Sequence, residues 1–146
     1  MMIEFNDWLA ICETKARYCR LLDAKDWAGW ADCFTEDFTL QIPGAEPWAG
    51  RDLALGSARK AIETAVTVHQ VHNPEIVLRA DGNSADVTWA LQDRVLWPQG
   101  REAGETFFGH TGYGNYREVY VRCGDGRWRI RSTVLTYLYR DLEPAP

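Results

Sequence analysis

The stretch RYCRLLDAKDW, residues 17–27, ends the first segment of the chain that has helical periodicity, and it carries an acidic residue on an otherwise apolar face. Upstream, apolar or small residues recur at intervals of three and four, which predicts a helix over residues 4–22 with one side turned inward. That side consists of Phe5, Trp8, Cys12, Ala16 and Cys19. Asp23 stands four residues further along the same face. Two placements are open for its carboxylate: inside, where burial requires a hydrogen-bond donor, or in solvent at the helix end.

The rest of the chain divides into two further helices and a run of strands. Asp26 is the expected N-cap of a short helix. The apolar positions of that helix are Trp27, Trp30 and Phe34. The other expected elements are a strand at 37–42, a helix at 52–65, and strands at 67–79, 84–97, 106–122 and 127–140, with tight turns at 80–83 and 123–126 and a longer loop at 98–104. Helices followed by a long antiparallel meander predict one α+β domain, residues 1–146, whose curved sheet encloses a cavity with the helices.

The composition disfavours several kinds of partner and cofactor. The net charge is -5, and no cluster of Lys and Arg is interleaved with aromatic residues, so nucleic acid is not expected as a partner. No stretch is apolar and long enough to span a membrane, and we expect a soluble, cytoplasmic protein. The cysteines lack a C-x-x-C pair and the histidines lack metal-ligand spacing, so a site without metal or cofactor is expected.

The strand at 84–97 places a second carboxylate on an apolar face. By strict alternation, one face holds Ala85, Val87, Trp89, Leu91, Asp93, Val95 and Trp97. A bulge that turns Asp93 outward, toward Arg94, is the alternative. If the alternation holds, Asp93 and Asp23 face one cavity and form a functional constellation.

Two histidines lie in the strand expected at 67–79. His69 and His72 are three residues apart, so regular pleating turns them to opposite faces of the sheet. Only one can then face the cavity, unless residues 73–74, Asn-Pro, bulge the strand. A lone histidine is usually structural, whereas one beside a buried carboxylate can serve as a general base near neutral pH.

Three blocks, YCRLLDAKDWAGWADCFTEDF, VHQVHNPEIVL and GNYREVYVRCGDGRWRI, resemble the SnoaL-like branch of the nuclear transport factor 2-like superfamily over nearly the whole chain. The motifs R-Y-x4-D-x-K-x-W, H-x2-H-x-P-E-I and W-x-L-x-D are similar to those of the bile-acid 7α-dehydratase type, with scytalone dehydratase and lindane dehydrochlorinase as further similar enzymes. The resemblance implies a cystatin-like cone in which N-terminal helices pack in a curved, mostly antiparallel sheet. It implies functional roles for Tyr18, Asp23, His69 and Asp93.

The chain departs from that pattern in one place. Tyr137 stands where the bile-acid enzymes offer an arginine to the substrate, and Arg140 follows three residues later. His110 and Tyr116 are loose counterparts of a histidine and a tyrosine in the cavity of scytalone dehydratase. Related domains also perform polyketide cyclisation, ketosteroid isomerisation and epoxide hydrolysis, so membership does not fix the reaction.

The resulting hypothesis is a cofactor-independent dehydratase or isomerase for a hydrophobic cyclic molecule of the steroid, polyketide or aromatic class. His69 would take the proton, Asp23 would fix its tautomer, and Tyr18 would donate to the developing enolate or leaving group. Asp93 would be a second acid or base, with its pKa raised by the apolar face, or a substrate anchor. The expected pocket lining is Trp48, Trp89, Trp97, Phe108, His110, Tyr116 and Tyr137.

Two other functions remain open at this point. One is a scaffold similar to the small subunits of aromatic-ring-hydroxylating dioxygenases, and the other is a module that binds a small molecule without turnover. In each case the outer face of the sheet is expected to pair with another copy, which would give a homodimer or homotrimer.

Overall fold

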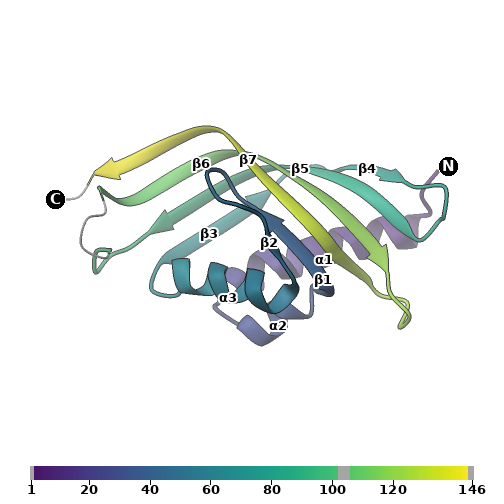
Figure 1. Ribbon diagram of the computed structural model, residues 1–146. Helices are drawn as coiled ribbons and strands as arrows, with labels where there is room; N and C mark the ends of the chain where they lie inside the picture. Colours follow the sequence, from purple (N-terminus) through teal and green to yellow (C-terminus); the bar gives the residue numbers. More distant parts are fainter. Residues whose placement is uncertain (1, 102–105, 145–146) are drawn as a thin grey trace.

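The computed structural model describes residues 2–101 and 106–144, in which helices pack against one side of a single curved sheet (Figure 1). The helices are α1 (Phe5–Asp23), α2 (Trp27–Ala31) and α3 (Arg51–Ile62). The strands are β1 (Phe34–Gln41), β2 (Trp48–Ala49), β3 (Val66–Val71), β4 (Glu75–Leu78), β5 (Ser84–Leu96), β6 (Phe107–Arg122) and β7 (Trp128–Pro144). The predicted α+β class is confirmed. The loop expected at 98–104 lies partly outside the described residues.

The strands follow the order β2-β1-β7-β6-β5-β3, and β4 pairs with β5 as well. Neighbouring strands are antiparallel except β1 and β7, which run parallel. The long strands β5, β6 and β7 curve over the helices, so the inward face of the sheet and the helices together bound the interior (Figure 1). Within the described part of the chain, no helix has the length and apolar character needed to cross a membrane.

Helix α1 buries a different face from the one that the apolar pattern predicts. Its buried residues are Ile11, Thr14, Lys15, Tyr18, Cys19 and Leu22. The prediction was wrong for Phe5 and Trp8, which are 68% and 38% exposed, and for Ala16, which is also exposed. The buried face includes polar residues that form hydrogen bonds in the interior. The Thr14 hydroxyl donates to the Trp128 carbonyl at 2.9 Å, and the Lys15 ammonium donates to the Glu118 carboxylate.

Asp26 caps α2 as expected, because its side chain accepts a hydrogen bond from the amide of Gly29 at 2.9 Å. The helix is shorter than predicted, and Phe34 begins β1 instead of closing α2. Helix α3 likewise ends at Ile62, three residues before the expected boundary.

Strand β5 keeps the strict alternation, so Asp93 points inward and is 3% exposed. The single strand predicted at residues 67–79 was wrong, because it splits into β3 and β4 on either side of Pro74, which has no amide hydrogen to offer the ladder. Both pieces pair with β5, and His69 lies directly opposite Asp93. This pairing brings the histidine of one strand and the carboxylate of the next to the same part of the interior.

Candidate active site

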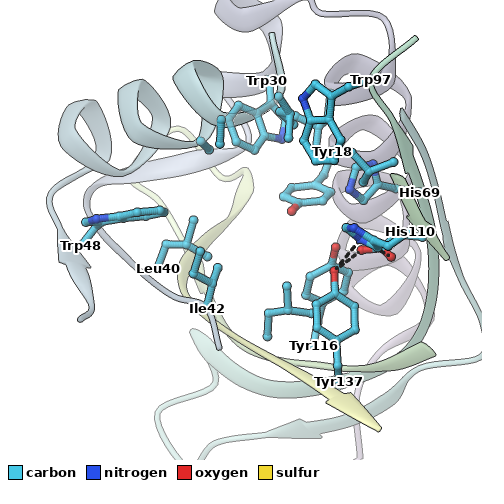
Figure 2. A pocket seen from close by; sticks show the side chains of 17 residues that line it. Tyr18, Trp30, Leu40, Ile42, Trp48, His69, Trp97, His110, Tyr116 and Tyr137 are labelled. Carbon is cyan, nitrogen blue, oxygen red and sulfur yellow. Dashed lines mark hydrogen bonds and ion pairs between the residues drawn. The ribbon is translucent and has the colours of Figure 1, made fainter. Parts of the chain in front are cut away.

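A cavity of about 160 Å³ lies between the helices and the inward face of the sheet (Figure 2). The helical elements contribute Tyr18, Leu22, Trp30, Ala58, Ala61 and Ile62. The strands and the residues next to them contribute Leu40, Ile42, Trp48, His69, Asp93, Val95, Trp97, His110, Tyr116, Leu135 and Tyr137. Figure 2 shows the apolar side chains Leu40, Ile42 and Trp48 on one wall and the histidines and tyrosine hydroxyls facing them.

The structure brings together most of the side chains that the sequence singled out. Tyr18, His69 and Asp93 line the cavity, and Asp23 lies behind His69. The expected lining residues Trp48, Trp97, His110, Tyr116 and Tyr137 are present as well.

Trp89 and Phe108 do not line the cavity, and these two predictions were wrong. Trp89 shares the inward face of β5 with Asp93 but packs within the hydrophobic core. Phe108 lies against Gly100, next to an irregularity in the pairing of β6 with β7. His72 follows the end of β3 and is exposed, so of the two neighbouring histidines only His69 faces the cavity.

His69 is held by the carboxylate of Asp23 at two points. Its ring Nδ1 lies 2.7 Å from Asp23 Oδ1, and its backbone amide donates to Asp23 Oδ2 at 2.8 Å. The Thr67 hydroxyl also donates to Oδ1, at 3.0 Å. An ionised carboxylate can only accept, so Nδ1 carries a hydrogen, and in the neutral form of the ring Nε2 keeps the lone pair. These three donors compensate for a carboxylate at the C-terminal end of α1, where the helix dipole disfavours it.

A second group of polar side chains lies beside His69. The Tyr137 hydroxyl donates to Asp93 Oδ2, and His110 Nε2 lies 3.3 Å from Asp93 Oδ1 and 3.4 Å from the Tyr137 oxygen. Gly112 sits opposite Asp93 in the ladder, and a β-carbon there would overlap both the Asp93 carboxylate and the Tyr137 ring. A glycine at this position therefore allows Asp93 and Tyr137 to meet.

The pKa of Asp93 is lower than its ordinary value, which corrects the expectation of a raised one. Burial by itself would raise this pKa, but the hydrogen bonds and charge that His110 and Tyr137 supply outweigh it. Burial first, and then the charge of Asp93, raise the pKa of Tyr137. The pair is therefore arranged as a carboxylate that accepts from a neutral phenol.

Next to two tyrosines of the cavity wall, Lys15 and Glu118 form an ion pair with a separation of 2.7 Å and no exposure of either side chain. The Lys15 ammonium lies 3.9 Å from the centre of the Tyr18 ring and 3.7 Å from that of Tyr116. Burial raises the pKa of both phenols, so both remain hydroxyl donors at neutral pH. This pair was not predicted, because Lys15 does not belong to the face that the apolar pattern turned inward.

Solved structures with the same architecture come from several bacteria. A variant of Rv3472, a Mycobacterium tuberculosis protein of unknown function, matches with a TM-score of 0.74 and 25% identity over 91% of this chain and 72% of its own. A putative scytalone dehydratase from Novosphingobium aromaticivorans matches with a TM-score of 0.80 and 20% identity over 96% and 89%. A protein from Catenulispora acidiphila, solved in complex with S-DNPA, matches with a TM-score of 0.74 and 20% identity over 92% of this chain and 95% of its own.

The sequence also matches a family of domains. The match to the SnoaL-like domain covers residues 4–134, which is most of the chain and includes α1, β3, β5 and β6. These elements carry His69, Asp23, Asp93 and His110. On this evidence the chain belongs to the SnoaL-like domain family, within the nuclear transport factor 2-like superfamily.

Proposed function

We propose that this protein is a cofactor-independent enzyme that abstracts a proton from a hydrophobic cyclic substrate and then either eliminates water from it or isomerises it. The observation that carries the proposal is the 2.7 Å contact between His69 Nδ1 and Asp23 Oδ1 at the wall of an apolar cavity. This contact leaves Nε2 as the basic atom of the ring, which is the arrangement that general-base catalysis requires.

In the proposed reaction His69 Nε2 takes a proton from a carbon next to a carbonyl or similar activating group. The negative charge of Asp23 stabilises the imidazolium that forms, and the Tyr18 hydroxyl donates to the developing enolate oxygen. A well-placed donor of this kind contributes on the order of 10²–10³ in rate. Because burial raises the pKa of Tyr18, this residue keeps its proton in the resting enzyme and acts as a hydrogen-bond donor.

The second polar group would complete either reaction. His110 lies close to both Asp93 and Tyr137, so a proton can pass among these three side chains without leaving the cavity wall. In a dehydration this group would protonate or bind the departing hydroxyl. In an isomerisation this group would donate a proton to a second carbon, while the proton taken from the first carbon stays on His69 until it is released to solvent. We propose Asp93 as the anchor of this group, since it contacts both partners.

The dimensions and charge of the cavity narrow the proposed substrate class. A cavity of about 150 Å³ in another protein holds benzene, and the volume here is about 160 Å³. Among the described residues that line the cavity there is no lysine or arginine, while Asp93 is negatively charged. These properties favour an uncharged substrate with one or two rings over a steroid or an anionic compound.

A small-molecule-binding module without turnover is the second candidate. The Catenulispora acidiphila structure with bound S-DNPA supports it, since that protein holds a small molecule on the same fold. The scaffold role, the homodimer or homotrimer and the cytoplasmic location stay predictions.

The test is a panel of one-ring and two-ring cyclic ketones, enones and hydroxyketones, with steroids for comparison, incubated with the protein in deuterated water. Mass spectrometry follows deuterium uptake and loss of water. We expect exchange with some of the smaller compounds and its loss in His69→Gln. His72→Gln is the matched control, because His72 is exposed and outside the cavity. If a compound binds but takes up no deuterium with the parent or with either variant, the binding module is favoured.

A further inference from the structure

Two side chains outside the cavity form a chain of hydrogen bonds that ends on the Asp23 carboxylate. The Lys25 ammonium donates to the Thr67 hydroxyl at 2.7 Å, and that hydroxyl donates to Asp23 Oδ1 at 3.0 Å. The same oxygen accepts from His69 Nδ1. Thr67 is buried and lies two residues before His69 on the same face of β3.

The charge of Lys25 fixes the direction of this chain. An ammonium group can only donate, so the Thr67 oxygen must accept from it. The single hydroxyl hydrogen of Thr67 is then left for Asp23. Without the ammonium, that hydrogen could rotate toward another acceptor, and Asp23 would lose one of the donors that hold its carboxylate in the plane facing His69.

Lys25 adopts a backbone conformation that a lysine rarely takes. Its φ is 59°, and it is the residue after the C-cap of α1, where glycine is usual. The amides of Lys25 and Asp26 close the helix end by donating to the carbonyls of Leu22 and Leu21 at 3.1 and 2.9 Å. Burial lowers the pKa of Lys25, and the charge of Asp23 opposes this effect. The turn therefore places a half-buried cation beside Asp23 at a position where glycine would fit with less strain.

We infer that Lys25 and Thr67 are positioning residues, which orient Asp23 so that it holds the Nδ1 hydrogen of His69 and keeps Nε2 directed at the cavity. Among the described residues, the charged or titratable groups on the cavity wall with His69 are Tyr18, Asp93, His110, Tyr116 and Tyr137, and Asp23 and Lys25 lie in the hydrogen-bond chain behind it. The catalytic consequence rests on the proposed function, but the effect on the His69 hydrogen does not.

The test measures the exchange of the His69 Nδ1 hydrogen with solvent by NMR of the ¹⁵N-labelled protein without any ligand. We expect the exchange rate of this hydrogen to be about tenfold higher in Thr67→Val than in the parent, which corresponds to the loss of roughly one hydrogen bond. Thr67→Ser keeps the hydroxyl and should restore the parent rate. Thr88→Val, on the outer face of β5, is the matched control and should behave as the parent. Unchanged exchange in folded Thr67→Val would overturn the inference.

A second variant tests the direction of the chain. Lys25→Met should also speed the exchange, because the Thr67 hydroxyl is no longer oriented. Since the two residues act in series, the double variant should exchange no faster than Thr67→Val alone. If the double variant instead speeds the exchange by the product of the two single effects, Lys25 and Thr67 act separately, and the proposed chain of hydrogen bonds is contradicted.

Activity separates this inference from the proposed function. If deuterium uptake by a substrate is lost in His69→Gln, Thr67→Val should lower the rate of uptake with little change in KM. If His69→Gln behaves as the parent, the proposed function fails, while the NMR result still supports or overturns the positioning roles of Lys25 and Thr67.

Discussion

Replacing Lys15 by methionine should destabilise the protein more than any exposed substitution, because it leaves a buried carboxylate without its cation. Lys15 and Glu118 are 2.7 Å apart and neither is exposed. Breaking a buried pair by removing one partner costs about 3–5 kcal/mol. Glu118 keeps two donors, the hydroxyls of Thr133 at 3.0 Å and Tyr120 at 2.8 Å, so we expect the lower end, about 3 kcal/mol.

The assay is urea unfolding of the parent, Lys15→Met, Glu118→Gln and the double variant at neutral pH. In a parallel thermal unfolding experiment, about 3 kcal/mol in a chain of 146 residues corresponds to a fall in Tm of roughly 10 °C. The double variant should be more stable than Lys15→Met, because no uncompensated charge remains.

A loss below about 1 kcal/mol in Lys15→Met would refute this reasoning, because it would place the pair in the range of exposed ion pairs. A double variant as unstable as Lys15→Met would refute it too. The packing of Lys15 on the two tyrosine rings, and not the pairing of charge, would then explain the cost.

Three further substitutions test the site itself. Asp23→Asn should lower the rate of deuterium uptake on the order of 10²–10⁴-fold, since an amide can hold the wrong tautomer of the imidazole, whereas substrate binding measured by calorimetry should persist. Tyr137→Phe removes a donor that lowers the pKa of Asp93. A lowered pKa in the folded state contributes stability above the unfolded pKa of about 3.9, and this contribution is lost as pH falls through the folded value. Urea unfolding should therefore show Tyr137→Phe about 1 kcal/mol less stable than the parent at neutral pH, with the difference fading in acid. Gly112→Ala should cost about 1–3 kcal/mol by overlap with Asp93 and Tyr137, while Gly124→Ala, which has open space around it, should be close to neutral.

Much of the fold follows from local patterns that tertiary contacts do not override. The alternation of β5 predicted its inward face, including Asp93, and the turn residues predicted the hairpins at 80–83 and 123–126. Gly82 and Gly126 have φ values of 66° and 79°, as tight turns require. Patterns of period two are reliable here because a register slip would expose the whole apolar face.

The buried face of α1 could not be predicted in the same way. Polar side chains such as Thr14 and Lys15 are buried only because distant residues satisfy them, and Glu118 is more than a hundred positions away. For Asp23 the pattern left two placements open, inside or in solvent, on a face that proved largely wrong. It reaches His69 because it ends the helix beside β3.

The sequence pattern held part of the information about the missed site residues. Thr67 and His69 share a face of one strand, and Tyr116 and Glu118 share a face of another, so period two alone groups them. What the pattern could not supply is the contact of Lys25 with Thr67, because it depends on a positive φ at a lysine.

The most direct test of the central claim compares His69→Gln with His72→Gln. The substrate is a cyclic ketone or enone that takes up deuterium from the solvent in the presence of the parent protein. The two histidines are three residues apart, but only His69 contacts Asp23 and lines the cavity. We expect exchange to fall at least a hundredfold in His69→Gln, the lower range for a positioned general base, and to stay at the parent rate in His72→Gln. Equal rates in the two variants would contradict the assignment of His69 as the base.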